Sequence, residues 1–435
     1  MEEMQNNESR PVNPRRRKKT KMEIFKESYL PAIIVGVALL LIVIFIIGSI
    51  VQNAQRNNQA QQDDDSAAQE ELEQKEKYEA EVQKLLGIAS NFAAQYEYDK
   101  AIAVLGTFTG NAEDYPALGE AKAKYEALKA SMVAWSDPSQ VLNLSFQMLI
   151  EDPIRAYADK TYKTQYNKNF ITTDEFVKIL DQLYSGGYML VRMSDLVQTG
   201  TDAEGNTTYE AKTLYLPEGK KPLIITQNQV NYYQYMIDSN GDHLPDEGGA
   251  GFASKLIIGQ DGKLTNQYVD VSGAALTGSY DLVPLLNDFI EAHPDFSYKG
   301  AKAIIAVSGY DGLFGYRTHS GAKKWLSEED YQAEIEGAKK IAQALRDDGF
   351  EIACYTFGNM AYGSISLQDV QSDIQKWNSE VVPVLGQIDT IVFAQLSDIA
   401  EPGQYSGNKF EALKNAGFRY FLGFCSDGDP FTFIA

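Results

Sequence analysis

Hydrophobic and polar positions after residue 140 follow a repeating pattern. Short apolar runs of four to seven residues recur, and longer amphipathic stretches lie between them. A short apolar run bounded by turn residues predicts a buried strand. Seven strands are expected: Val141–Phe146, Tyr188–Val191, Leu223–Gln227, Ala301–Val307, Glu351–Tyr355, Thr390–Phe393 and Tyr420–Phe424.

The amphipathic stretches predict helices between several of these strands. Thr172 or Thr173 before Glu175, and Ser327 before Glu328, are typical helix starts. Gly186, Gly187 and Gly349 stand where helices need a left-handed residue to end. The expected helices are Thr173–Ser185, Leu282–His293, Glu328–Asp347, Leu367–Val381 and Lys409–Asn415.

Strands that alternate with helices imply a parallel sheet. Seven such strands suit a distorted, incomplete (β/α) barrel better than an open dinucleotide-binding sheet. No Gly-x-Gly-x-x-Gly follows any of the strands, so no dinucleotide site is expected. We therefore predict an α/β fold, a distorted seven-stranded barrel over residues 139–435, with a boundary at the turn Ser136–Ser139.

The first third of the chain has a different pattern. No charged residue occurs from Ser28 to Gln55, and Ile33–Val51 is almost wholly aliphatic. A helix of about 20 apolar residues spans a bilayer core. The flanking tail carries eight basic and five acidic residues, and positive flanks stay in the cytoplasm. We predict a cytoplasmic tail (1–28) and an uncleaved signal anchor (29–52); a cleaved signal peptide is the alternative.

A helical stalk is expected outside the membrane, over residues 53–135. Gln52–Gln74 is polar, and Tyr78–Met132 is helical in pattern. Within it, Ala89–Leu105 resembles a tetratricopeptide helix–turn–helix. One such unit cannot bury its own apolar face. We therefore favour a helical spacer over a peptide-binding module.

Net charge and cysteine content indicate which partners and which covalent links to expect. The net charge of −21 disfavours nucleic acid as a partner. The only cysteines, Cys354 and Cys425, lie on or after strands that are not adjacent in the predicted order, so two buried thiols are expected rather than a disulfide.

Four segments of the barrel region resemble the polysaccharide deacetylases (carbohydrate esterase family four). Pro222-Leu-Ile-Ile-Thr-Gln-Asn-Gln229 is similar to the strand that ends in an Asp-Asp pair in that family. Thr173–Tyr188 resembles the helix that runs into Gly-Tyr, and Asp347–Asn359 resembles the segment that carries His-Ser/Thr-x-x-His. Leu144–Ile150 looks like the opening Ser-Phe-His, with Gln147 in place of His.

The resemblance implies a metal-dependent hydrolase whose chemistry has been replaced. In the family, Asp, His and His bind a divalent metal and a second Asp is the general base. The matching positions are Gln229, Tyr355 and Asn359 for the metal and Asn228 for the base. Amides are poor zinc ligands and cannot accept a proton near neutral pH. Zinc is predicted to be absent, and no cofactor is expected.

Two loops carry further candidate chemistry. Gly309–Thr318 follows the fourth strand. Its side chains are glycan-binding candidates together with Asn228, or else cover the barrel mouth: Tyr310, Asp311, Phe314, Tyr316 and Arg317. Asp238–Glu247 spaces oxygen ligands like the start of a calcium loop, or is simply an acidic turn: Asp238, Asn240, Asp242 and Asp246.

These observations favour a single-pass bacterial membrane protein with an extracellular, deacetylase-like domain. Its expected role is binding, with cell-wall polysaccharide or an envelope protein as partner. One alternative is a working deacetylase or glycosidase that uses Asp311, Asp398 or Glu401. Another is an envelope scaffold that acts through the helical stalk.

Overall fold

The computed structural model describes residues 62–423, except 136, 138–139, 159–161, 206, 239–250 and 400–404. The chain divides into two compact units between Glu81 and Val82. The predicted tail (1–28) and signal anchor (29–52) lie outside the described residues. Among the helices that are described, none is both long enough and apolar enough to span a membrane.

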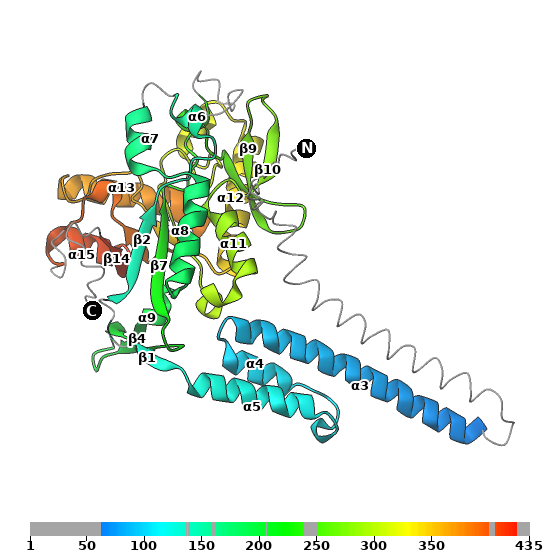
Figure 1. Cartoon of the computed structure of the whole chain (residues 1–435). Helices are drawn as coiled ribbons and strands as arrows, with labels where there is room; N and C mark the ends of the chain where they lie inside the picture. Colours follow the sequence, from blue (N-terminus) through cyan, green and yellow to red (C-terminus); the bar gives the residue numbers. More distant parts are fainter. Residues whose placement is uncertain are drawn as a thin grey trace, which may run out of the picture. The chain divides into compact units, whose positions relative to one another are not determined.

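A parallel sheet of seven strands forms the centre of the second unit (Figure 1). Its order is β14-β13-β12-β11-β7-β2, and β3 also pairs with the beginning of β7. All seven predicted strands are confirmed. Their bounds are β2 Leu142–Phe146, β3 Tyr188–Leu190, β7 Lys221–Asn228, β11 Ile304–Val307, β12 Glu351–Cys354, β13 Thr390–Val392 and β14 Tyr420–Leu422.

The sheet curls but does not close within the described residues. There, β2 pairs only with β7, and β14 pairs only with β13. The predicted distorted barrel is thus, in the part that the structure describes, a curled parallel sheet covered by helices. Because all the strands are parallel, their carboxyl ends meet at one edge.

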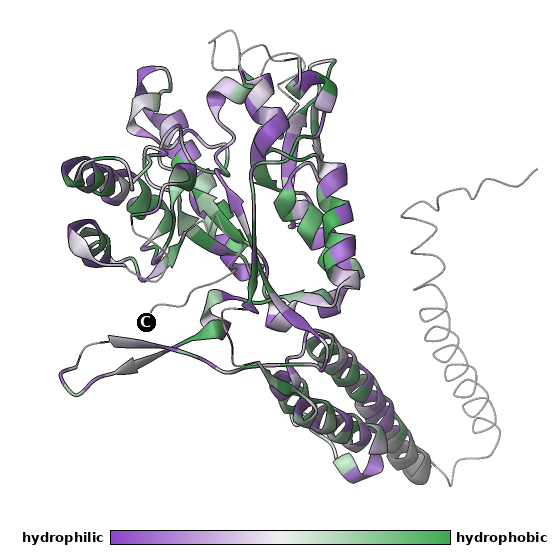
Figure 2. Ribbon diagram, turned by 60° about the vertical axis from the view of Figure 1, so that its left-hand side comes forward, coloured by the Kyte–Doolittle hydropathy of each residue, from purple (hydrophilic) through white to green (hydrophobic). Residues whose placement is uncertain are grey.

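The two faces of the sheet have different neighbours. Ile225, Ile305 and Ile352 belong to the core cluster that packs under the helices. Ile224, Ile304 and Ala353, one position away, belong to a second cluster on the concave face. Neighbouring residues fall in different clusters because successive side chains of a strand point to opposite faces of the sheet. Figure 2 shows the strands largely green and the helices green on one side and purple on the other.

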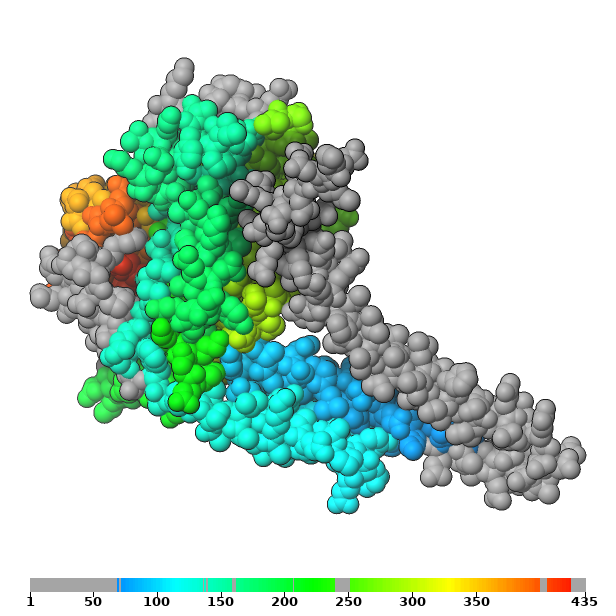
Figure 3. Space-filling view, in the orientation of Figure 1, coloured from blue at the N-terminus to red at the C-terminus, as the bar shows by residue number. Residues whose placement is uncertain are grey.

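Helices cover the convex face. Leu180 and Leu183 of α8 pack in the same core cluster as Leu190 and Leu223. In the view of Figure 3, the segment that contains α7 and α8 lies on the face of the molecule towards the viewer. The covering helices are α6 Pro153–Ala156, α7 Lys163–Asn169, α8 Thr173–Ser185, α11 Leu282–Ala292, α12 Glu328–Asp347, α13 Leu367–Lys376 with the π-helical turn η6 Trp377–Val381, α14 Val382–Leu385 and α15 Gly407–Asn415.

The predicted starts of α8 and α12 are confirmed. The Thr172 hydroxyl accepts a bond from the Glu175 amide, and the Glu175 carboxylate accepts one from the Thr172 amide. At the start of α12, the Ser327 hydroxyl accepts a bond from the Asp330 amide. After α8 the left-handed residue is Gly187 (φ 81°), whereas Gly186 has a φ of −76°. Gly349 has a φ of 94°, and a Cβ there would lie 2.2 Å from the Gly300 carbonyl oxygen. The chain can therefore turn from α12 into β12 only with glycine at this position.

Antiparallel strands that the sequence pattern did not predict surround the sheet. β1 (Val133–Trp135) pairs with β6 (Leu214–Leu216), and β4 (Val197–Thr201) pairs with β5 (Thr207–Ala211). A three-stranded sheet lies between β7 and α11 in the sequence and consists of β8 Lys255–Ile258, β9 Leu264–Val269 and β10 Ala275–Gly278. Short helices complete the unit: α9 Met193–Leu196, α10 Gln234–Ile237, η3 Pro294–Phe296, η4 Tyr298–Gly300, η5 Ser320–Lys324 and η7 Ala394–Leu396.

The stalk region is helical, as predicted: α3 Gln62–Ala94, α4 Tyr98–Leu105, η1 Ala112–Asp114 and α5 Pro116–Ala130. Ala101 of α4 and Leu118 and Tyr125 of α5 share one small core. The turn after α3 contacts the main domain, because the Lys299 amide donates to the Gln95 carbonyl (2.7 Å) and Tyr96 stacks on Tyr298. The likeness to a tetratricopeptide unit stays a prediction.

Candidate functional site

Polar, uncharged side chains gather at the carboxyl ends of three strands. Gln147 directly follows β2, Gln229 directly follows β7, and Tyr355 directly follows β12. Asn359 lies four residues beyond Tyr355. Together with Asn228, the last residue of β7, we call these residues the amide cluster. The structure thus brings together the four positions at which the resemblance implied a lost metal and base, and it adds Gln147.

Hydrogen bonds connect Gln147, Gln229 and Asn359 within the amide cluster. Gln229 Nε2 donates to Gln147 Oε1 (3.2 Å), and Asn359 Nδ2 donates to Gln229 Oε1 (3.4 Å). The Gln229 and Gln147 side chains also lie beside the Tyr355 phenol. Asn228 Nδ2 donates to Ser145 Oγ on the neighbouring strand (2.7 Å). The contacts within the cluster are long, so they hold its side chains only weakly.

The cluster is uncharged near neutral pH. Burial raises the pKa of the Tyr355 phenol, although hydrogen bonds from Gln395, Gln229 and Gln147 act in the opposite direction. A phenol in this state is neutral, so it can donate as well as accept. None of the other four residues carries a titratable group.

Two buried oxygens of the amide cluster have no partner among the described residues. They are the side-chain carbonyl oxygens of Asn228 and Asn359. Asn228 is only 1% exposed. A buried acceptor without a partner costs about 1–3 kcal/mol, and native proteins rarely keep one without a reason. A bound molecule that supplies donors, water included, would remove that cost.

Backbone strain concentrates around the same edge of the sheet. Ten non-glycine residues in the described chain have positive φ, and eight of them lie in the loops that follow β7, β11, β12 and β13: Gln229, Tyr232, Asp311, Phe314, Thr356, Asn359, Gln395 and Leu396. Such conformations cost of order 1–3 kcal/mol each and gather at functional sites. The strain therefore indicates that these loops have a function besides connecting each strand to the next element.

Gln395 is a member of this region that sequence reasoning missed. Its amide N–H donates to the Tyr355 phenol oxygen (3.3 Å), and its Nε2 donates to the Asn359 carbonyl (2.6 Å). Leu396 beside it is 72% exposed. No local signal marks this turn, because neither residue is a glycine.

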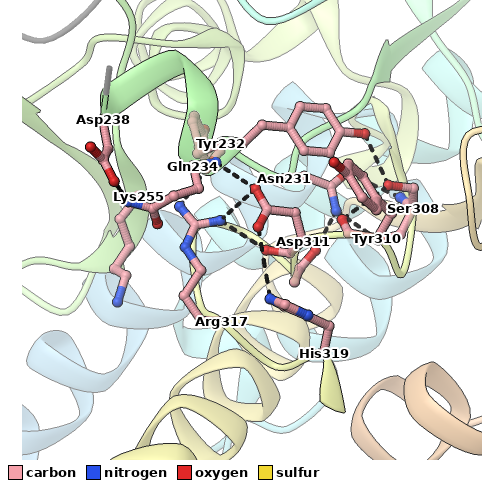
Figure 4. Close-up of polar contacts among 12 residues, drawn as sticks. Asn231, Tyr232, Gln234, Asp238, Lys255, Ser308, Tyr310, Asp311, Arg317 and His319 are labelled. Carbon is pink, nitrogen blue, oxygen red and sulfur yellow. Dashed lines mark hydrogen bonds and ion pairs between the residues drawn. The ribbon is translucent and has the colours of Figure 1, made fainter. Parts of the chain in front are cut away.

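The loop after β11 folds around an ion pair (Figure 4). Arg317 Nη1 lies 3.3 Å from Asp311 Oδ2, and Arg317 Nη2 donates to the Tyr232 carbonyl (2.7 Å). The Gln234 amide also donates to Asp311, and His319 Nε2 lies 3.8 Å from its second oxygen. Asp311 and Arg317 were predicted to bind sugar hydroxyls. They instead bind each other and the backbone, because both are largely shielded from water.

The three aromatic residues of this loop differ in their exposure to solvent. Phe314 is fully buried, so its prediction as a stacking surface is wrong. Tyr316 packs under Lys255, whose Nζ lies 4.0 Å from the ring centroid. Tyr310 is 54% exposed and is the one member of the predicted set with a ring open to solvent.

Asp398, another predicted carboxylate, is bonded within its own segment of the chain. Asp398 accepts hydrogen bonds from the Tyr405 hydroxyl and the Ile399 amide, so it fixes its own loop. Glu401 lies outside the described residues.

The predicted calcium loop is described only at Asp238, which accepts a bond from Gln234 Nε2 (3.2 Å). Asn240, Asp242 and Asp246 lie outside the described residues, so calcium binding stays a prediction. Within the described ranges, no three His, Cys, Asp or Glu side chains are grouped as metal ligands. Cys354 is buried with a free thiol, and Cys425 is not described.

A pocket of about 630 Å³ lies away from the amide cluster, around the amino end of β11. Its lining includes Lys302 and Lys263, and each is already paired with a carboxylate of the same pocket, Asp348 and Glu291. We therefore place the candidate site at the amide cluster, where polar groups lack partners.

Taken together, the fold and the site define an α/β protein with an uncharged polar site at the carboxyl edge of a curled parallel sheet. No family model and no curated protein matches the sequence. Among solved structures, a Streptococcus pyogenes deacetylase, PplD, in complex with acetate, is similar at 13% identity and a TM-score of 0.31. The alignment covers 65% of this chain and 82% of that one.

Proposed function

We propose that this chain is a membrane-anchored, deacetylase-like protein that binds glycan without hydrolysing it. One observation carries the proposal: the positions that resemble a metal site and its base converge at one sheet edge as amides and a phenol. Such groups cannot hold zinc well or take up a proton at neutral pH. They can exchange hydrogen bonds with the hydroxyl groups of a neutral sugar.

The unpartnered oxygens of Asn228 and Asn359 support a ligand of this class. Sugar hydroxyls are donors, and a site that is uncharged avoids the cost of burying an unpaired charge. Tyr310 adds an exposed ring close to the cluster, since its amide N–H donates to the carbonyl of Phe357, two residues before Asn359. Polar groups beside an aromatic ring form a suitable surface for a sugar.

The test is glycan binding by the full-length chain in detergent micelles, measured by calorimetry with N-acetylglucosamine oligomers. Gln147→Leu and Tyr355→Phe each remove hydrogen-bonding atoms from the amide cluster and keep most of the side-chain shape. Each is expected to weaken binding about tenfold, the equivalent of one lost hydrogen bond. Gln198→Leu is the matched control, because Gln198 is an exposed residue of β4.

Binding that is unchanged in both cluster variants would contradict the proposal. So would stoichiometric zinc in the purified protein together with release of acetate from the oligomers.

A further inference from the structure

Four tyrosines form a continuous row beside the amide cluster. The ring centroids of Tyr162 and Tyr235 are 5.0 Å apart, those of Tyr235 and Tyr233 are 5.7 Å apart, and those of Tyr233 and Tyr310 are 5.8 Å apart. We call these residues the tyrosine row. Tyr233 and Tyr235 are stacked with an angle of 17° between their planes. The four rings come from three separate segments of the chain, so tertiary folding assembles the row.

One ring of the row is buried, and the two rings beside it are exposed. Tyr233 is 2% exposed, and its hydroxyl bonds to Ser308 Oγ (2.9 Å). Tyr235 and Tyr310, which contact it, are 43% and 54% exposed. The buried ring thus holds two solvent-facing rings in fixed positions. Aromatic rings held in this way lose little conformational freedom when a ligand binds.

The row is continuous with the amide cluster. The Tyr233 and Tyr355 phenols are close enough to influence each other electrostatically. The Tyr310 amide donates to the Phe357 carbonyl (2.8 Å), which lies between Tyr355 and Asn359 in the sequence. Both features therefore lie at the carboxyl ends of β7, β11 and β12.

We propose that the tyrosine row is an extended subsite for a glycan chain, on which sugar rings outside the amide cluster stack. This inference rests on the proposed function, because it assigns a second part of the same ligand. Sugar rings present apolar C–H faces that pack on aromatic rings, whereas their hydroxyls point sideways to polar groups. The row would consequently make affinity depend on the length of the glycan.

The test compares a dimer and a hexamer of N-acetylglucosamine on the full-length chain in micelles. The hexamer is expected to bind more tightly than the dimer. Tyr235→Ala should weaken hexamer binding about threefold to tenfold, in line with the loss of one aromatic contact, and leave dimer binding unchanged. Tyr235→Phe should retain hexamer affinity, because it retains the ring.

Tyr215→Ala is the matched control, since Tyr215 is 53% exposed on β6, outside the row. Equal affinity of the wild-type chain for dimer and hexamer would overturn the subsite and leave the amide cluster as the binding site. Equal weakening of both oligomers by Tyr235→Ala would also overturn it. If the wild-type chain binds neither oligomer, the proposed function itself fails.

Discussion

Glu351 is a buried carboxyl group at the beginning of β12, at the end of that strand opposite to Tyr355. One of its oxygens accepts a bond from the Met193 amide (3.3 Å), and Arg192 and Asp195 lie nearby. Burial raises its pKa from 4.5 to about 7, although the Met193 and Arg192 contacts lower it. The folded protein therefore holds this proton more tightly than the unfolded chain does.

This pKa predicts a pH dependence of stability. The contribution of Glu351 is most favourable below about pH 4.5, decreases as the pH rises towards about 7, and is constant above that. Glu351→Gln should therefore be more stable than the wild type at pH 8, by up to about 3 kcal/mol. The two should be nearly equal at pH 4.

Urea unfolding at both pH values measures this difference. Glu336→Gln is the control, because the Glu336 side chain is 58% exposed. The difference in free energy of unfolding between Glu351→Gln and the wild type should be larger at pH 8 than at pH 4. A smaller difference at pH 8 would contradict the raised pKa of Glu351.

Helix α8 shows how an element is specified by its own sequence. Its reciprocal cap joins Thr172 to Glu175, and Phe176, Leu180 and Leu183 form its buried face. The cap and the 3.6-residue period both lie within one short segment, so the sequence predicts both ends of the helix correctly.

Removing the cap tests this account of α8. Thr172→Ala should lower the free energy of unfolding by about 1 kcal/mol, because the Glu175 amide loses its acceptor. Thr172→Ser keeps the hydroxyl and should restore most of the loss. Urea unfolding of the wild type and the two variants measures these free energies. A serine variant as unstable as the alanine variant would rule out capping as the cause.

Elements that depend on distant partners could not be predicted in this way. β1 pairs with β6 about eighty residues later in the chain, and β4 and β5 are polar strands without a clear apolar face. In the candidate site, too, some residues could be predicted from the sequence and others could not. Asn228, Gln229, Tyr355 and Asn359 lie at or after the ends of predictable strands. Tyr235 of the short helix α10 joins the site through ring contacts, and Gln395 joins it through a turn with positive φ, and both features arise only in the folded chain.

For the molecule as a whole, the charge distribution and the aliphatic segment 33–51 suggest attachment to a membrane. We expect the full-length chain to stay in the membrane fraction of the producing bacterium after an alkaline carbonate wash. Deletion of residues 1–52 should release it, since this segment holds the predicted anchor. Release of the full-length chain by the wash would contradict the membrane assignment.

The central claim, binding without hydrolysis, is tested most directly by measuring both properties on one sample. The full-length chain in micelles is incubated with an acetylated hexamer and added zinc, and bound oligomer and free acetate are quantified together. The account predicts saturable binding that Tyr355→Phe weakens, and no acetate above the rate of a protein-free control. Acetate release that a chelator abolishes, or the absence of any binding, would contradict it.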